Sequence, residues 1–323
     1  GINNVLSFQL LVKSYMDLMV ADSTKGFTTG GTENLDSSTP YLFMSNHRDI
    51  SLDPAFIDYA MFMNNRETVR IAIGDNLLSK PYASDLMRIN KSFIVKRSAI
   101  GRQMLLEYKK LSSYIRKSIE EDRHSIWIAQ REGRAKDSLD RTEPAVIKMI
   151  SLSRRNKEES LGEFIESVHL LPVSISYEWD PLDSAKALEQ YHKDNDGEYK
   201  KNDHEDLSSI GLGYIGQKGA VNVHFGKPVT GEFENHEQVA KAVDKQVIGN
   251  YMLHPSNFIA YHRITGTLPG FNCGAKHKPF KFDDFPEEVK EFDKRLNDQP
   301  EYLHKYILDI YANPVVSRLA LDK

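Results

Sequence analysis

The chain has 323 residues, of which 40% are apolar and 27% are charged. This composition is typical of a globular protein and leaves room for one large α/β domain or two small ones. The 42 basic and 46 acidic residues give a formal net charge of -4, which argues against nucleic-acid binding but conceals any local basic patch. Cys273 is the single cysteine, so no intrachain disulfide can form and a reducing compartment such as the cytoplasm is expected.

The N-terminal part of the chain carries a helical pattern. No apolar run reaches the roughly 18 residues that a membrane-spanning helix needs, and no signal peptide is visible. The first residue is Gly1 and not Met, which leaves open a preceding segment of the natural protein, including a membrane segment. Residues 5–20 predict an amphipathic helix that packs on the core, with a peripheral contact at a membrane surface as the alternative. Residues 23–38 are rich in Gly, Thr, Ser and Asp and predict a loop.

Short apolar runs then alternate with helical patterns. This alternation predicts an α/β fold, with a mostly parallel central sheet flanked by helices and with helical N- and C-terminal additions. The predicted strands cover residues 41–44, 70–73, 92–95, 125–129, 170–176 and 221–225, and the predicted helices cover residues 54–63, 99–120, 143–152 and 237–253.

The last third of the chain predicts additions to this domain. Residues 191–208 are strongly polar and predict a surface insertion, and residues 274–285 predict a connector. A helical pair is expected over residues 287–297 and 301–311. We therefore divide the chain into an N-terminal helix and loop (1–38), an α/β domain (39–260) and a C-terminal helical extension (261–323).

Residues 45–54, with the sequence SNHRDISLDP, are the most informative stretch. His47 follows an apolar strand pattern, and Asp53 precedes Pro54 at the start of a predicted helix. In the simplest interpretation Asp53 only caps that helix. A capping aspartate can also hold a nearby imidazole as a general base, which makes His47 and Asp53 a candidate catalytic pair. Asp49 is a rival partner for the histidine, and Arg48 lies close enough in sequence to reach a substrate phosphate.

Two later strand patterns end in clusters of cations. Lys96 and Arg97 close the run KSFIVKR, where the simplest interpretation is a solvated strand end and the alternative is a phosphate-binding arginine with Lys96 or Lys91 beside it. Residues 131–136 read REGRAK, which is either a charged surface turn or an anion site. In the surface turn, Glu132 pairs locally with an arginine. In the anion site, Arg131, Arg134 and Lys136 supply donors, and Gly133 permits close backbone approach.

A fourth stretch, LLPVSISY at residues 170–177, predicts a buried strand with a proline near its start. In this order and at these spacings, the four stretches resemble the glycerolipid acyltransferase family of glycerol-3-phosphate and 1-acylglycerol-3-phosphate (lysophosphatidate) O-acyltransferases. The family's His…Asp block is matched by His47 and Asp53. Its Phe-Ile-x-Arg, Glu-Gly-Thr-Arg and proline-containing blocks are matched by residues 93–97, 132–134 and 171–173.

This sequence departs from the family pattern at two places. His47 and Asp53 have five residues between them instead of four, and one residue is missing between Gly133 and Arg134. Asp53 is favoured over Asp49 because a similar Asp-Pro pair stands at this helix start in the soluble plastid-type members. The four blocks cover about residues 40–180, so the resemblance accounts for a little under half of the chain.

The resemblance implies an enzyme of phospholipid synthesis that moves an acyl group from acyl-CoA or acyl carrier protein to glycerol 3-phosphate or lysophosphatidate. It implies His47 as the general base, Asp53 as its partner, and direct attack of the acceptor hydroxyl on the thioester. Backbone N–H groups at the start of the helix after Asp53 are expected to stabilise the oxyanion. Neither a cofactor nor a metal is expected. Arg97 and Arg134 are the first candidates for the phosphate, followed by Lys96, Arg131 and Lys136.

Other functions remain open at this stage. An amine or a different hydroxyl could be the acceptor, the enzyme could be a thioesterase, or the chain could be an inactive lipid-binding homologue, which the shifted His47–Asp53 spacing would favour. Within the family, the length of residues 180–323 favours a larger glycerol-3-phosphate-type member. We expect a cytoplasmic protein, with peripheral contact on the cytoplasmic membrane face left open.

Overall fold

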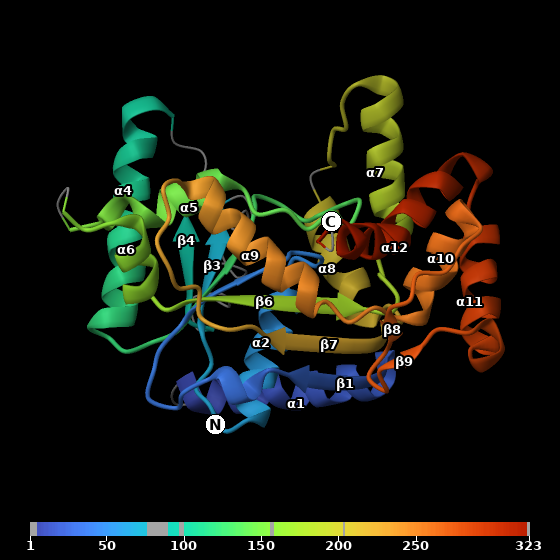
Figure 1. Ribbon diagram of the computed structural model, residues 1–323, viewed down its shortest axis with the longest axis horizontal. Coiled ribbons are helices and arrows are strands. Elements are labelled where there is room, and N and C mark those ends of the chain that lie inside the picture. Colours follow the sequence, from blue (N-terminus) through green and yellow to red (C-terminus); the bar gives the residue numbers. More distant parts are fainter. Residues whose placement is uncertain (1–4, 76–89, 97–99, 156–157, 203, 322–323) are drawn as a thin grey trace.

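The computed structural model describes residues 5–75, 90–96, 100–155, 158–202 and 204–321. Within these residues, seven strands form one sheet in the order β1-β7-β6-β2-β5-β3-β4 (Figure 1). The five strands from β6 to β4 in this order are parallel to one another, whereas β7 is antiparallel to β6 and pairs in parallel with β1. The predicted α/β fold, with a mostly parallel sheet flanked by helices and with helical additions at both ends, is confirmed.

The strands of the main sheet are β1 (Thr24–Gly30), β2 (Leu42–Ser45), β3 (Arg70–Gly74), β4 (Ser92–Val95), β5 (Ile126–Ala129), β6 (Leu170–Tyr177) and β7 (Gly219–Phe225), and β8 (Asn272–Cys273) pairs with β9 (Lys278–Pro279). The α-helices are α1 (Val5–Ser23), α2 (Leu52–Met63), α4 (Gly101–Glu120), α5 (Pro144–Ile150), α6 (Leu161–Ser167), α7 (Asp183–Asp196), α8 (Glu205–Ile215), α9 (His236–Asn250), α10 (Pro255–Thr265), α11 (Pro286–Asn297) and α12 (Glu301–Leu321). Short 3₁₀ helices are η1 (Thr32–Asn34), η3 (Ser151–Ser153) and η4 (Phe282–Asp284).

Each of the six predicted strands corresponds to an observed one, but the loop prediction for residues 23–38 is wrong at β1. This strand lies at the edge of the sheet, pairs only with β7, and has Phe27 as its single large apolar residue. An edge strand that is half exposed does not need the apolar run that marks a buried strand. Gly30 is required by packing, since a Cβ there would lie 2.5 Å from Nδ1 of His224.

The polar region that was predicted as a surface insertion is more ordered than expected. Residues 191–208 contain the end of α7 and the start of α8, with irregular chain between them. Helix α7 is stabilised by the pair between Lys193 and the buried Glu189, one turn apart at 2.7 Å. Gly197 ends it with a φ of 79°, a conformation that glycine adopts without strain. Helices α6 and α10 were also not predicted, and the connector at residues 274–285 contains β9 and η4.

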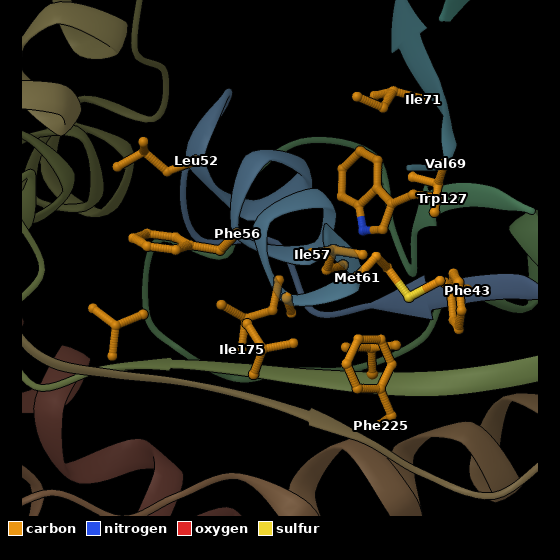
Figure 2. Packing of buried hydrophobic residues seen from close by; sticks show 14 of the residues in the cluster. Phe43, Leu52, Phe56, Ile57, Met61, Val69, Ile71, Trp127, Ile175 and Phe225 are labelled. Atoms are coloured by element: carbon orange, nitrogen blue, oxygen red, sulfur yellow. The ribbon is translucent and has the colours of Figure 1, made fainter. Parts of the chain in front are cut away.

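The core follows the alternation of side chains along the strands. Phe43 of β2 and Trp127 of β5 pack on one face of the sheet against α1 and α2 (Figure 2). Their neighbours Leu42 and Met44 point to the other face, where α4, α5, α6 and α9 cover them. A third cluster joins α7 to the C-terminal helices α10, α11 and α12. The C-terminal additions therefore have a core of their own, continuous with α7.

The predicted N-terminal helix is α1. Its Met16 and Met19 are buried against the sheet, as expected for a helix packed on the core, whereas Leu10, Tyr15 and Leu18 are exposed. In the described part of the chain, α1 and the other helices all lack the length and apolar content needed to cross a membrane.

The topology brings the candidate site residues to one edge. Because β2, β3, β4, β5 and β6 are parallel, their carboxyl ends meet at the same edge of the sheet, which is where ligands bind in open α/β folds. His47 follows β2, Arg131 follows β5, Lys96 follows β4 and Tyr177 ends β6.

Candidate active site

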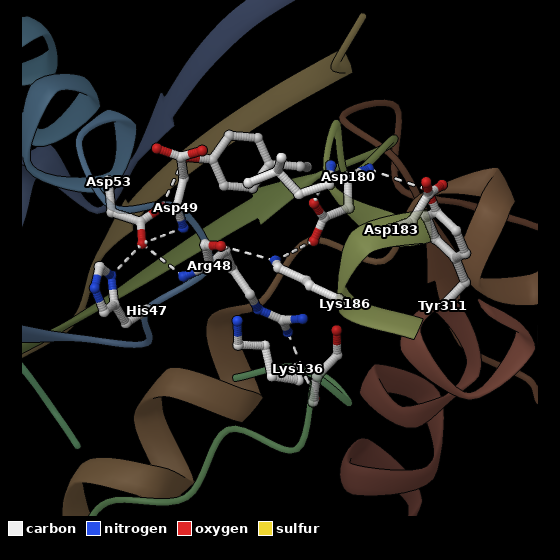
Figure 3. A network of polar contacts seen from close by, with 12 residues as sticks. His47, Arg48, Asp49, Asp53, Lys136, Asp180, Asp183, Lys186 and Tyr311 are labelled. Atoms are coloured by element: carbon white, nitrogen blue, oxygen red, sulfur yellow. Dashed lines mark hydrogen bonds and ion pairs between the residues drawn. The ribbon is translucent and has the colours of Figure 1, made fainter. Parts of the chain in front are cut away.

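His47 and Asp53 are in direct contact. Nδ1 of His47 lies 2.8 Å from Oδ2 of Asp53 (Figure 3). The carboxylate of Asp53 is fully buried, and its other oxygen, Oδ1, accepts a hydrogen bond of 2.8 Å from the hydroxyl of Tyr177. An ionised carboxylate only accepts hydrogen bonds, so Nδ1 of His47 donates and Nε2 carries the free lone pair. This is the tautomer that a general base requires.

The extra residue between the histidine and the aspartate is accommodated by the backbone. Oδ2 of Asp53 also accepts from the N–H groups of Arg48 at 2.6 Å and Asp49 at 2.9 Å, which folds the loop around the carboxylate. Asp49 instead points away from His47 and accepts from the N–H groups of Ser51 and Leu52. The structure therefore pairs His47 with Asp53 and not with Asp49. The four N–H groups at residues 48, 49, 51 and 52 are all engaged within this loop.

The side chain of Arg48 is buried and points away from the candidate base. Its Nη2 donates to Asp140 at 2.6 Å, and its guanidinium lies 5.4 Å from the ring centroid of Tyr251. Asn46 fixes the same loop to β6 by exchanging two hydrogen bonds of 2.8 and 2.9 Å with the backbone of Ile175. In this arrangement Arg48 holds the loop in place and does not line the cavity beside His47.

A cavity of about 400 Å³ opens beside His47. The ring of Trp127 forms an edge-to-face contact with the imidazole, at 5.7 Å between centroids, and also lines the cavity. The side next to β3, β4, α4 and α5 is mainly apolar, with Ile73, Val95 and Met149 in its wall. The opposite side is charged and is built by residues 131–137 together with parts of α7 and α8. The cavity is therefore amphipathic, and its apolar and charged parts are both next to the candidate base.

Three of the predicted phosphate-binding residues line this cavity, each beside a carboxylate. Arg131 lies 3.9 Å from Glu143, and Arg134 lies 3.9 Å from Asp206. Lys136 contacts Glu189 at 2.5 Å. Burial, followed by the charge of Arg134, lowers the pKa of Lys136 to about 8. Glu132 and Gly133 line the cavity as well, and Gly133 has a φ of +72°, which only a residue without a Cβ adopts freely.

The two remaining candidates are Lys96 and Arg97. Lys96 is exposed, lies 3.5 Å from Glu107, and does not line the cavity. Arg97 lies outside the described residues.

Helices α7 and α8 contribute cavity-lining side chains that sequence reasoning missed. Counting only described residues, the cavity is lined by five cationic and five anionic side chains: Arg131, Arg134, Lys136, Lys193 and Lys201 against Glu132, Asp137, Glu143, Glu189 and Asp206. No motif marks the members that come from α7, α8 and the segment between them. Tyr177 was the last residue of a recognised strand, but its contact with Asp53 joins positions 124 residues apart and has no local signal.

One family model matches the part of the chain that contains this site. Residues 26–176, from β1 to the end of β6, match the family model described as Acyltransferase. The crystal structure of the 1-acyl-sn-glycerophosphate (LPA) acyltransferase PlsC from Thermotoga maritima is similar, with a TM-score of 0.40 and 16% identity over 75% of this chain and 78% of that one. No curated protein is significantly similar to the chain. The matched residues contain both His47 and Asp53, and residues 26–176 of this chain are a domain of the acyltransferase family.

Proposed function

We propose that the protein is an O-acyltransferase that moves a fatty acyl group from acyl-CoA or acyl carrier protein to a glycerol-phosphate-type acceptor, glycerol 3-phosphate or lysophosphatidate. One observation carries the proposal: the His47–Asp53 pair lies at a cavity that has apolar residues on one side and Arg131, Arg134 and Lys136 on the other. The acyl thioester donor and the acceptor lysophosphatidate each combine a polar group with an acyl chain, and glycerol 3-phosphate offers the polar group alone.

In the proposed mechanism, Nε2 of His47 takes the proton of the acceptor hydroxyl. Asp53 keeps Nδ1 protonated and stabilises the imidazolium that forms. The acceptor oxygen attacks the thioester carbonyl, the carbon–sulfur bond breaks, and the proton on His47 passes to the departing thiolate. No acyl-enzyme step is needed. Cys273 does not support one, since it is buried and burial raises the pKa of its thiol to about 12, whereas the thiolate is the nucleophile.

The charged side of the cavity would receive the acceptor phosphate. Arg134 and Arg131 can each present two N–H donors to a phosphate, and Lys136 adds a compact charge. Lys96 and Arg97 remain candidates for the same phosphate or for the polar part of the donor. The apolar side, with Ile73, Val95 and Met149, supports the acyl chain. A phosphate would have to displace Glu143, Asp206 and Glu189 from their present partners.

The test is thiol release from a long-chain acyl-CoA by the purified protein. The assay is run with glycerol 3-phosphate, with lysophosphatidate and without acceptor, and is repeated with acyl carrier protein as donor. We expect acceptor-dependent release that is lost in His47→Ala. His192→Ala is the matched control, since it removes an exposed histidine that is also paired with an aspartate, Asp196 at 2.6 Å, but lies outside the cavity wall.

Each other outcome points to a stated alternative. Release without acceptor would indicate a thioesterase, and no release with either donor would favour an inactive lipid-binding homologue. Full activity of His47→Ala would refute the mechanism.

A second acceptor class is supported by the charges of the cavity. Five carboxylates balance the five cations among the described lining residues, so the site is not simply cationic. An acceptor that carries an amine, alone or beside a phosphate, would find partners in Glu189 and Asp206. The acceptor panel therefore includes an amine-bearing lysophospholipid and a non-phosphorylated amino alcohol, and preferential acylation of either would favour this class.

Peripheral contact with a membrane fits the proposed substrates. The exposed Leu10, Tyr15 and Leu18 give α1 an apolar face on the side away from its buried Met16 and Met19. The double variant Leu10→Gln/Leu18→Gln leaves the buried face intact. It should reduce co-sedimentation with liposomes containing anionic lipid, and unchanged co-sedimentation would exclude this face as the contact.

A further inference from the structure

Lys186 is a fully buried lysine that contacts the loop carrying His47. It lies in α7, beyond the end of the acyltransferase-family domain, and its side chain is 1% exposed. Its Nζ donates to the backbone oxygen of Arg48 at 2.7 Å and to the carboxylate of Asp180 (Figure 3). It does not line the cavity, so it touches neither candidate substrate.

The burial of this lysine is weak evidence that its ion pair stabilises the fold. Removing an ammonium group from water is costly, and a buried ion pair is often no more stabilising than apolar residues of the same volume. The pairing with Asp180 offsets part of that cost, and this lysine, together with Arg48, holds the pKa of Asp180 below its usual value even though burial opposes this. The hydrogen bond from Lys186 to Arg48 has a consequence that the ion pair with Asp180 does not have. It restrains a backbone oxygen of the residue that follows the candidate base.

Arg48 is held at three points, which together restrain the backbone on both sides of this residue. Its N–H donates to Asp53, its side chain donates to Asp140, and its carbonyl oxygen accepts from Lys186. Without Lys186, the carbonyl would lose this side-chain donor and the plane of the peptide between Arg48 and Asp49 could rotate. The N–H of Asp49, which is part of that peptide, would then turn away from Oδ2 of Asp53.

Lys186 is itself fixed by the C-terminal helices. The hydroxyl of Tyr311, in α12, donates to Asp183 at 2.7 Å and accepts from the N–H of Asp180 at 3.1 Å (Figure 3). The start of α7 is thereby attached to α12 on the side opposite to the loop. The geometry links α12, through α7, to the peptide next to His47.

We propose that Lys186 is a positioning residue that holds the Arg48 carbonyl and thereby keeps Asp53 aligned with His47. The proposal rests on the proposed function, in which His47 is the base. A misplacement of about 1 Å at a catalytic group can lower a rate about 100-fold, so we expect that loss in kcat from Lys186→Met. The KM of the acceptor should not change, since Lys186 does not line the cavity.

Lys218→Met is the matched control. Lys218 is also fully buried and donates to Ser23 and to the carbonyl oxygens of Tyr214 and Gly216, all away from the cavity. Both variants remove a buried ammonium group and its hydrogen bonds, so both should lower the melting temperature. Only Lys186→Met should lower kcat. If Lys186→Met does not fold, Lys186→Met/Asp180→Asn removes the carboxylate that would otherwise be left unpaired.

A second measurement does not depend on turnover. The Nδ1 proton of His47 should give a low-field proton NMR signal that is absent from His47→Ala. We expect this signal to be present in Lys218→Met and lost through solvent exchange in Lys186→Met or in its double variant. A kcat for the Lys186 variant within threefold of the Lys218 variant, or an unchanged Nδ1 signal, would overturn the proposal.

The two proposals fail in different ways. If the wild-type protein transfers no acyl group, the proposed function fails, and the Nδ1 signal still tests the role of Lys186. If the wild type is active and the two lysine variants behave alike, only the positioning role fails.

Discussion

The hydroxyl of Tyr177 donates to Oδ1 of Asp53 at 2.8 Å, in a site where neither side chain is exposed by more than 6%. This contact joins the last residue of β6 to the first turn of α2. Asp53 thus has donors on both oxygens, with His47 and two backbone N–H groups on Oδ2 and Tyr177 on Oδ1. The orientation of the carboxylate toward His47 depends on both sets.

Tyr177→Phe should lower kcat about tenfold and destabilise the fold by about 1–2 kcal/mol, because it leaves one buried carboxylate oxygen without its donor. Tyr41→Phe is the control. Tyr41 is equally buried and its hydroxyl accepts from the N–H of Asp36, far from His47 in the fold. Steady-state kinetics and thermal unfolding of both variants check this. A kcat for Tyr177→Phe equal to that of Tyr41→Phe would remove Tyr177 from the site.

The sheet could be predicted wherever burial imposes a pattern on the sequence. The strands β2, β5 and β6 lie in the middle of the sheet and are apolar on both faces, so their runs stand out. The edge strand β1 is paired on one side only and reads TKGFTTG, which has the composition of a loop. Helix α7 was missed for a related reason, since only a few of its residues are buried and its sequence is mostly polar.

The candidate site could be predicted only where its residues are close in sequence. His47 and Asp53 are six positions apart, and Arg131, Arg134 and Lys136 lie in one turn. The contact of Lys186 with Arg48 spans 138 residues and follows from the packing of α7 on the loop. A lone lysine in a polar helix resembles any solvated residue. Its complete burial, which the sequence does not reveal, is what makes it informative.

Acceptor binding should weaken above about pH 8. The pKa of Lys136 is lowered to about 8, mainly by burial, so the side chain is charged below this pH and neutral above it. The KM of glycerol 3-phosphate should therefore rise as the pH increases from 7 to 9. The acceptor phosphate is already fully ionised in this range, since its second pKa is near 6, and does not contribute to the change. In the variant Lys136→Arg the side chain stays charged throughout this range, so the KM of glycerol 3-phosphate should depend much less on pH. An equally steep profile in that variant would assign the titration to another group.

Asp206→Asn should strengthen the binding of a phosphate acceptor. Asp206 lies 3.9 Å from Arg134 and 2.8 Å from Lys201, and its charge competes with a phosphate for both. A partly exposed ion pair contributes about 0.5–1 kcal/mol, so the KM of the acceptor should fall about two- to fivefold. Asp196→Asn, which removes one charge from α7 outside the cavity wall, should leave the KM unchanged. A rise in the KM of Asp206→Asn would contradict a phosphate acceptor and would favour an amine.

Gly213→Ala should disturb the loop from the side of α8. A Cβ at Gly213 would lie 2.3 Å from Oδ2 of Asp49, a buried oxygen that has no hydrogen-bond partner among the described residues. Asp49 would have to move, and its bonds to the N–H groups of Ser51 and Leu52 at the start of α2 would be lost. Overpacking of this kind costs about 1–3 kcal/mol, so the melting temperature should fall by several degrees and kcat should fall with it.

Gly211→Ala provides the comparison for this substitution. It lies two positions earlier in α8, and a Cβ there would meet no atom within 4 Å. Alanine is favoured over glycine inside a helix by about 1 kcal/mol, so this variant should be slightly more stable than the wild type and fully active. Thermal unfolding and kcat measured on the two variants separate the contact with Asp49 from the general effect of a methyl group. If Gly213→Ala were stabilised to the same extent as Gly211→Ala, the close approach of α8 to Asp49 would be disproved.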